Sequence, residues 1–363
     1  MQVREPPLDL PSKPDRPIYF ASLIAGLEPI VAEEVRERLP GAELLGMLRG
    51  RVFLAWDGRP ADVLGLMTVE NVFGYAGQLA DLPATREGPP VIEQAMREMA
   101  LEPALALFER LHGPHPDPSF RITAQRSGSH AYNSLDIAAA SGAGVVQRYG
   151  WGVDLEGFDY DVRVYVTDDT ALVGLRLSRE ALHKRARVAH GAASLNPTVA
   201  HAMCRLTGPV ADGVFVDPMC GAGTILIERA RLGGDPLLAG GDRYEEPLRR
   251  AARNLQAREV AASLLQWDAR DLPLADGSVD SIACNLPWGR RIGSHTVNIH
   301  LYPGFMRGAA RVLRPEGLAV LLTQEKRLLT RLIEKSRRLE LTGCHPLSLG
   351  GLLPSIYVVR RQS

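Results

Sequence analysis

The residues best suited to chemistry in this chain are four consecutive ones, Asn285, Leu286, Pro287 and Trp288. The Asn285 side-chain carbonyl and the Leu286 backbone carbonyl could both accept hydrogen bonds from one amino group, while Pro287 stiffens the backbone by fixing φ. Trp288 offers a flat face for stacking, which contributes about 1–3 kcal/mol per base in single-strand binders. The pattern indicates a loop that holds a flat, amino-bearing base, although such a tetrad also occurs in ordinary turns.

A glycine-rich turn lies upstream, between a short apolar strand and an apolar helix start. Residues 214–217 are typical of a buried strand that ends in Asp217, and the turn that follows contains Gly221 and Gly223. A strand, a glycine-rich turn and a helix form the first βα unit of a doubly wound nucleotide-binding sheet. The two glycines let the backbone approach a ligand closely, because they carry no Cβ.

Two further acids follow at the ends of predicted strands. Asp242 ends a strand over residues 239–242, which is the usual place for a carboxylate that binds ribose hydroxyls. Asp268 ends the next short strand, residues 263–265, and is the candidate partner of an adenine amino group. Along the chain, the glycine-rich turn is followed by Asp242, then by Asp268, and then by the tetrad loop. This order suits four successive strands of one sheet whose ends place all four features at the same edge.

The nature of the cofactor follows from the turn and its acid. A dinucleotide would favour the spacing G-x-G-x-x-G, whereas this turn reads Gly-Ala-Gly-Thr. Asp217 would also meet the negative pyrophosphate, whereas the sulfonium of S-adenosylmethionine suits a carboxylate better. A NAD-dependent oxidoreductase would further need a hydride-handling His or Tyr near the site, and the sequence offers none. The remaining alternative is an ordinary glycine turn in an α/β domain.

Two stretches resemble known families. Residues 190–363 resemble the class I, Rossmann-fold S-adenosylmethionine-dependent methyltransferases, in the branch with D-P-x-C-G-x-G-T and [DN]-x-P-[FYW]. Residues 75–178 resemble a THUMP domain, an RNA-binding module, in the stretches 120–130, 150–155 and 161–166. The pair resembles the THUMP-linked RNA guanine-N2 methyltransferases. The resemblance implies an α/β chain in which a Rossmann-fold methyltransferase domain follows a ferredoxin-like module and a THUMP domain.

The resemblance also implies a site. The catalytic tetrad is Asn285 to Trp288, and the cofactor S-adenosylmethionine is expected to contact Asp217, Pro218, Cys220, Gly221, Gly223, Thr224, Asp242, Arg243, Asp268, Ala269, Asn285 and Asn196. Asn196 could equally be a plain helix N-cap. The implied target is a tRNA guanosine, at position 6 first and position 10 next, followed by ribosomal RNA.

The tetrad departs from the family at Leu286, where many amino-methyltransferases have Pro, and at Trp288, where Phe or Tyr is commoner. Adenine N6 methylation uses a similar tetrad, so these departures affect the target more than the chemistry. A non-catalytic RNA-binding protein with a vestigial methyltransferase fold also remains open. Its signature would be loss of Asp217, Gly221, Asp242 or Asn285, and all four are present.

Composition is compatible with this interpretation. The 363 residues exceed one core, and the formal net charge of zero divides into −6 over residues 1–110 and +6 over residues 111–363. The cysteines at 204, 220, 284 and 344 have no C-x-x-C spacing, so we expect neither a metal site nor disulfides. Without a long apolar run or a leader peptide, we expect a cytoplasmic monomer whose partner is tRNA and not a membrane.

The expected organisation has five parts. These are a disordered Pro-rich tail (1–17), a ferredoxin-like module (18–74), a THUMP domain (75–178), a basic linker (179–194) and the methyltransferase domain (195–363). The patterns predict strands over 18–23 and 51–56, and helices over 29–39, 61–67, 91–111 and 198–206. We expect His295 and His300 in a surface loop after the tetrad.

Basic residues mark a possible RNA track. The linker region carries Arg176, Arg179, Lys184, Arg185 and Arg187 against the single acid Glu180, which suits phosphate contacts as well as a solvated helix face. The predicted RNA-binding residues are Arg126, Lys184, Arg185 and Arg187. For a second basic cluster on a late helix, residues 326–338, we favour a solvated face.

Overall fold

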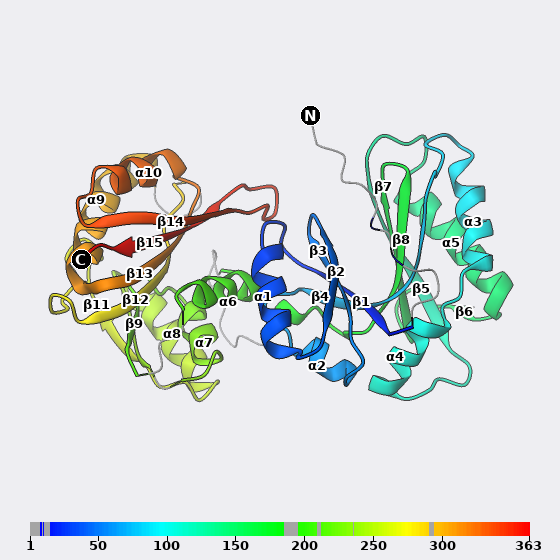
Figure 1. The fold of residues 1–363 in the computed structure, drawn as a ribbon, viewed down its shortest axis with the longest axis horizontal. Helices are drawn as coiled ribbons and strands as arrows, with labels where there is room; N and C mark the ends of the chain where they lie inside the picture. Colours follow the sequence, from blue (N-terminus) through cyan, green and yellow to red (C-terminus); the bar gives the residue numbers. More distant parts are fainter. Residues whose placement is uncertain are drawn as a thin grey trace. The chain divides into compact units, whose positions relative to one another are not determined.

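A computed structural model describes residues 8, 10, 15–184, 195–208, 212–234, 236–289 and 294–363. The chain forms two compact units (Figure 1). The first unit comprises Met1–Leu23 and Ala32–Leu182, and the second comprises Ile24–Val31 and His183–Ser363.

The first unit is built on one eight-stranded sheet in the order β2-β3-β1-β4-β8-β7-β5-β6. Strand β5 runs parallel to β6 and β7, and the other pairs are antiparallel. The strands are β1 (Ile18–Ser22), β2 (Glu43–Leu48), β3 (Arg51–Ala55), β4 (Asn71–Leu79), β5 (Ser119–Ser127), β6 (Gly152–Val153), β7 (Tyr160–Thr167) and β8 (Thr170–Arg176).

The helices of this part of the chain are α1 (Glu28–Arg38), α2 (Pro60–Leu64), α3 (Gly88–Glu98), α4 (Glu102–His112) and α5 (Ser134–Tyr149), with a 3₁₀ turn at Leu182–Lys184. The single helix predicted over 91–111 is wrong, because α3 ends and α4 begins within it. Met99 has extended backbone geometry (φ −68°, ψ 128°), and a proline lies in the first turn of α4. Pro103 lacks an N–H donor and its ring would clash with a preceding helical turn, so it fits a helix start but not a helix interior.

The expected disordered tail is partly ordered. Leu8 and Leu10 pack on an apolar cluster that includes Phe20, Phe53 and Phe73. Leu10 is only 7% exposed. The prediction is therefore wrong for these two residues, and residues 1–7, 9 and 11–14 lie outside the described part of the chain.

The expected boundary between residues 74 and 75 falls inside β4. This strand pairs with β1 on one side and with β8 on the other. The predicted ferredoxin-like module and the predicted THUMP region therefore share one continuous sheet. The division into these two modules stays a prediction, whereas the sheet that joins them is a feature of the structure.

The second unit contains a seven-stranded sheet in the order β11-β10-β9-β12-β13-β15-β14. The first five strands in this order are parallel, and β15 is antiparallel to both of its neighbours, β13 and β14. They are β9 (Val214–Asp217), β10 (Leu237–Asp242), β11 (Ser263–Gln266), β12 (Val279–Asn285), β13 (Leu313–Thr323), β14 (Leu339–Pro346) and β15 (Ser355–Arg361). The expected doubly wound arrangement is confirmed, and the carboxyl ends of β9 to β12 lie at one edge.

The helices that follow residue 195 in the described part of this unit are α6 (Pro197–Leu206), α7 (Thr224–Ala230), α8 (Glu245–Gln256), α9 (His295–Val312) and α10 (Lys326–Glu334). Tyr302 and Phe305 of α9 are fully buried in the core that also contains Ile282 of β12. His295 and His300 lie in α9, so the surface loop predicted for them is wrong. The helix starts there because the Ser294 hydroxyl accepts a hydrogen bond from the Val297 N–H at 3.2 Å.

Candidate cofactor and base site

The glycine-rich turn after β9 depends on left-handed backbone. Gly221 has φ 52° and Gly223 has φ 78°, a region that non-glycine residues rarely occupy. A Cβ on Gly223 would also lie 3.3 Å from the Ala251 side chain of α8, whereas one on Gly221 would meet nothing within 4 Å. The Cys220 N–H donates to the Gly241 carbonyl at 2.8 Å and joins the turn to β10.

Asp242 ends β10, as predicted, and its carboxylate is tied to the turn. One oxygen accepts from the Gly221 N–H at 3.2 Å and the other from the Tyr244 N–H at 3.1 Å. The carboxylate is half-buried. Each oxygen keeps a further lone pair, so the group can accept hydroxyl donors such as those of a ribose. Arg243 and Tyr244 are exposed beside it, and no pattern in the sequence pointed to the tyrosine.

Asp217 is 1% exposed and lies beneath the turn, where its Oδ1 accepts from the Met219 N–H at 3.3 Å. Burial raises the pKa of this carboxyl well above its usual range, and the nearby charge of Asp242 adds to the effect. Burial also raises the pKa of the Cys220 and Cys284 thiols. Both cysteines are buried, and a cofactor contact at Cys220 stays a prediction. Asp217 supports the turn through its bond to the Met219 N–H.

The segment after β11 is fixed by Trp267. Its indole N–H donates to the Pro218 carbonyl at 3.0 Å, and its ring lies 2.0 Å from where a Cβ on Gly241 would stand. Only glycine therefore fits at position 241. Asp268 follows two residues beyond the strand end, and its oxygens bind the Arg270 guanidinium at 3.0 and 2.6 Å. This guanidinium lowers the pKa of Asp268, so the carboxylate stays charged.

The tetrad begins where β12 ends. Trp288 donates its indole N–H to Asn285 Oδ1 at 3.1 Å, which fixes the orientation of the Asn285 carboxamide. Leu286 is 1% exposed, and its N–H donates to the Leu322 carbonyl of β13 at 3.0 Å. The family departure to Leu is therefore explained by burial in the core, and the departure to Trp by a hydrogen bond that Phe cannot make.

Two buried residues that the sequence did not indicate donate to the Pro287 carbonyl, and a third contacts one of them. Pro287 O accepts from Asn298 Nδ2 at 2.8 Å and from the Tyr302 hydroxyl at 2.7 Å. The Tyr302 hydroxyl also lies 2.7 Å from Thr323 Oγ1. We call Asn298, Tyr302 and Thr323 the Pro287 clamp, and all three are fully buried. In the sequence, the signal for the clamp was the spacing of Asn298 and Tyr302, because residues four apart share one face of a helix.

Glu325 lies beside the clamp, at the start of α10. Its carboxylate is 2.9 Å from His295 Nδ1 and 3.4 Å from Asn298 Nδ2. A Cβ on Gly289 would come within 2.8 Å of it. The end of the tetrad loop is therefore packed against α9 and the start of α10 by polar contacts.

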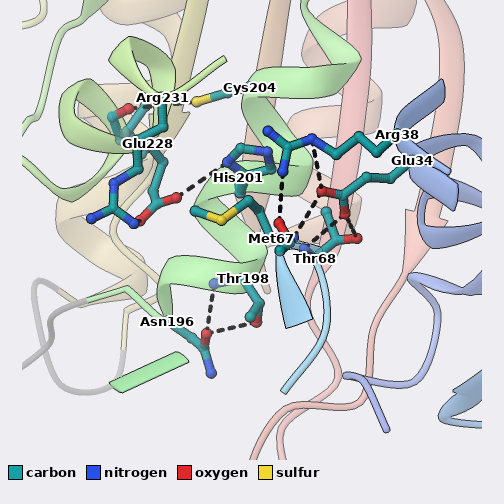
Figure 2. Close-up of polar contacts among 12 residues, drawn as sticks. Glu34, Arg38, Met67, Thr68, Asn196, Thr198, His201, Cys204, Glu228 and Arg231 are labelled. Carbon is teal, nitrogen blue, oxygen red and sulfur yellow. Dashed lines mark hydrogen bonds and ion pairs between the residues drawn. The ribbon is translucent and has the colours of Figure 1, made fainter. Parts of the chain in front are cut away.

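Asn196 caps α6, one of the two roles considered for it. Its Oδ1 accepts from the Thr198 N–H at 2.8 Å and from the Thr198 hydroxyl at 2.7 Å (Figure 2). The same helix carries fully buried His201, whose Nδ1 lies 3.2 Å from the Glu228 carboxylate of α7. These contacts fix the start of α6 and its packing on α7, and a cofactor contact at Asn196 stays a prediction.

The structure thus gathers much of the expected cofactor set at one edge of the second unit's sheet. The turn contributes Pro218, Cys220, Gly221, Gly223 and buried Thr224. Asp242 reaches the turn through hydrogen bonding, while Asp268 and buried Ala269 follow Trp267, which binds the turn at Pro218. These groups fit an adenosine-bearing cofactor, because they offer carboxylates for ribose and a close-approach backbone.

The expected RNA residues fall elsewhere. Arg126 is exposed in β5 and donates to the carbonyl of Gly128 at 2.7 Å. Lys184 is exposed at the end of the 3₁₀ turn. Arg185 and Arg187 lie outside the described residues.

Across the described ranges, every helix is too short or too polar to traverse a lipid bilayer. Within the same ranges, no three histidine, cysteine, aspartate or glutamate side chains gather in a way that could hold a metal ion.

Comparison with known proteins gives matches over both units. Residues 98–176 match the THUMP domain family, and residues 184–353 match the family described as RMKL-like, methyltransferase domain. A Thermus thermophilus protein named tRNA (guanine(6)-N2)-methyltransferase is 34% identical over 350 residues, which cover 93% of this chain and 97% of the relative. The crystal structure of TrmN from Thermus thermophilus has a TM-score of 0.78 and 29% identity, covering 95% of this chain and 99% of that one.

A human protein, tRNA (guanine(6)-N(2))-methyltransferase THUMP3, is 36% identical over 258 residues. The match covers 67% of this chain and 51% of the human protein, so the chain spans about half the length of that relative.

Proposed function

This chain belongs to the family of THUMP-domain tRNA guanine-N2 methyltransferases, and from that membership we propose that it methylates the exocyclic N2 amino group of a tRNA guanosine. The methyl donor is S-adenosylmethionine. The favoured target is position 6, because the Thermus thermophilus and human relatives are both named for guanine 6. The protein acts as a monomer in the cytoplasm.

The observation that carries the proposal is the Asn285 carboxamide at the end of β12. Its orientation is fixed by the Trp288 indole, and the following Leu286 is anchored in the core. In the same sheet, Asp242 ends β10 and is tied to the glycine-rich turn. A base held at the tetrad and a cofactor held at the turn would therefore both lie at the carboxyl edge of this sheet.

The protein's part in the reaction is to hold one nitrogen. S-adenosylmethionine supplies an electrophilic methyl group when bound, so the difficult chemistry belongs to the cofactor. Guanine N2 is a poor nucleophile because its lone pair delocalises into the ring. Acceptance of both N–H bonds by Asn285 Oδ1 and the Leu286 carbonyl would draw that lone pair out of conjugation and aim it. Near-attack alignment of this kind is a large contribution to rate.

The Asn285 side chain is neutral and is not a strong base, so the proton leaves after methyl transfer, to water or to a nearby group. A guanine in a helical stem must first leave the stack, which costs a few kcal/mol. Trp288 is half-buried at the tetrad and keeps a face that can stack on the base, which offsets part of that cost.

The proposal is tested with methyl-labelled cofactor and tRNA, followed by digestion to nucleosides. We expect label in N2-methylguanosine, and label in N6-methyladenosine instead would show that the loop holds a different base. Asn285→Ala should lower kcat on the order of 10²-fold or more, by analogy with the loss of an oriented charge-stabilising group. The fall in kcat should be far larger than any fall in cofactor affinity, because the lost bond is made to the reacting nitrogen.

Trp288→Phe is the matched variant, because it keeps a stacking face and loses the bond to Asn285. Loss of one hydrogen bond of about 0.5–1.5 kcal/mol predicts a fall in kcat of about 2- to 12-fold. Turnover of Asn285→Ala at the wild-type rate would remove the role given to the tetrad.

A further inference from the structure

A cluster of arginines surrounds one buried carboxylate in the first unit. Asp161 of β7 is 3% exposed, and its Oδ2 lies 2.8 Å from Arg121 of β5 and 2.8 Å from Arg163 of β7. Arg176, the last residue of β8, lies 3.7 Å from the same oxygen. The other oxygen accepts from the Thr123 hydroxyl at 2.9 Å.

The cluster carries more positive charge than its carboxylate can balance. Three guanidinium groups face one aspartate, so a formal charge of about +2 remains on this part of the sheet. Burial and the neighbouring charge of Arg163 lower the pKa of Arg176, which reflects the cost of this crowding. In the described part of the chain, the Nε donors of Arg121 and Arg163 have no hydrogen-bond partner. An anion bound at the exposed part of the cluster would relieve the repulsion.

The cluster lies on the sheet face that the helices do not cover. Arg121 pairs with Asp161 across β5 and β7, whereas the alternating neighbours Phe120 and Tyr160 are buried on the opposite face. That opposite face receives α5, since a Cβ on Gly142 would lie 3.8 Å from Ile122. Successive strand residues point to opposite sides, so the arginines point away from α5.

Arg121 gives this cluster its access to solvent. Its side chain is 28% exposed, compared with 15% for Arg163 and 12% for Arg176. Its guanidinium lies 3.8 Å from the centre of the Phe158 ring, which holds the side chain in place. Two more buried arginines therefore support one accessible guanidinium, the donor group that matches a phosphate in planar, bidentate fashion.

We propose that Arg121, Arg163 and Arg176 form a binding site for a phosphate of the RNA backbone. The inference rests on the proposed function, which makes RNA the substrate. A phosphodiester fits better than an acidic peptide, because exposed Arg179 follows Arg176 by three residues within the same unit. A second guanidinium close along the chain suits a ligand that carries successive phosphates.

The test compares Arg121→Gln with Arg148→Gln in the full chain. Arg148 is a matched control, since it is also 28% exposed, lies in the first unit and forms an ion pair with Glu102 at 3.5 Å. tRNA binding is followed by fluorescence anisotropy over a range of salt concentrations. One phosphate contact accounts for about 0.9 in the slope of log K against log salt on a duplex. We expect Arg121→Gln to lose about that much and Arg148→Gln to keep the wild-type slope.

Arg121→Lys separates charge from packing, because it keeps the charge and changes the shape. We expect it to keep most of the slope that Arg121→Gln loses. A slope lowered equally by Lys and Gln would mean that Arg121 only supports the sheet, and the site would be refuted. Equal slopes in wild type, Arg121→Gln and Arg148→Gln would also refute it.

Failure of the proposed function would look different. If the wild-type protein bound tRNA no more tightly than unrelated polyanions, the proposal that RNA is the substrate would be refuted, and the phosphate site with it. Thermal stabilisation by S-adenosylhomocysteine should be the same in all variants, because the cofactor residues lie in the second unit. Thermal unfolding of each variant, followed by circular dichroism, should match the wild type and shows whether the first unit keeps its fold.

Discussion

Asp242 is held in place before any ligand arrives. Its two oxygens accept from two backbone N–H groups, one of them in the glycine-rich turn. A preorganised acceptor loses little conformational freedom when it meets a ribose, so its remaining lone pairs contribute directly to affinity. The same carboxylate therefore holds the glycine-rich turn in place and is available to bind the ribose.

Replacement of Asp242 tests the binding role. We expect Asp242→Ala to weaken S-adenosylmethionine binding by about 1.5–3 kcal/mol, the range for loss of a charged hydrogen-bond partner. Isothermal titration calorimetry measures the difference. Asp276→Ala is the control, because Asp276 is 77% exposed and binds Arg311. Equal affinities for wild type and Asp242→Ala would contradict the ribose assignment.

Asp217 makes stability depend on pH. Burial raises its pKa, so the folded state holds the proton more tightly than the unfolded state. The free energy of unfolding should therefore fall as pH rises above about 4, the ordinary aspartate value, until the folded pKa is passed. Each pKa unit of elevation corresponds to about 1.4 kcal/mol.

Asp217→Asn replaces the titratable carboxyl by a neutral carboxamide, which still has an oxygen to accept from the Met219 N–H. We expect the variant to be more stable than wild type at neutral pH, with the difference closing below about pH 4. Urea unfolding at a series of pH values measures it. A difference between the two proteins that does not change with pH would count against a protonated Asp217.

At the scale of elements, α9 and β13 determine the position of the tetrad loop through the Pro287 clamp. Tyr302→Phe removes one of the two donors to Pro287 O and leaves Asn298 in place. We expect kcat to fall about 2- to 12-fold, since a hydrogen bond contributes about 0.5–1.5 kcal/mol. The KM for the cofactor should not change, because the clamp acts on the base loop.

Tyr19→Phe provides the comparison for this variant. The Tyr19 ring is fully buried in the first unit, and among the described residues its hydroxyl has no hydrogen-bond partner. It therefore reports the cost of removing a buried tyrosine hydroxyl that does not act on the tetrad. A kcat for Tyr302→Phe as high as that of Tyr19→Phe would remove the positioning role of the clamp.

The sequence predicted elements whose signals are local. The β9 strand, the glycine turn and Asn285 lie next to one another along the chain, and their residue types restrict the backbone directly. The clamp could not be predicted in this way, since Tyr302 and Thr323 meet only when α9 packs on the sheet. The bond from Trp288 to Asn285 likewise depends on a side-chain orientation that no spacing specifies. Helix α9 was not predicted, although Ser294 is a good N-cap.

At the scale of the whole molecule, the excess positive charge after residue 110 should determine RNA affinity. We expect the combined substitution of Lys184, Arg185 and Arg187 by Gln to flatten the salt dependence of tRNA binding by up to about three in slope. Cofactor affinity should stay the same. The comparison is a triple Gln variant at Lys335, Arg337 and Arg338, which we expect to keep the wild-type slope. Equal salt slopes in the two triple variants would contradict the prediction that the linker residues contact RNA phosphates.

Strand β4 has a consequence for how the first unit can be inherited and engineered. A cut after residue 74 would leave unpaired backbone on both sides of the break, and such open edges invite aggregation. Amide protons of β1 and β8 should therefore exchange with solvent through the same cooperative opening, although one belongs to each predicted module. A chimaera that borrows the RNA specificity of a relative would have to take residues 18–176 as one block.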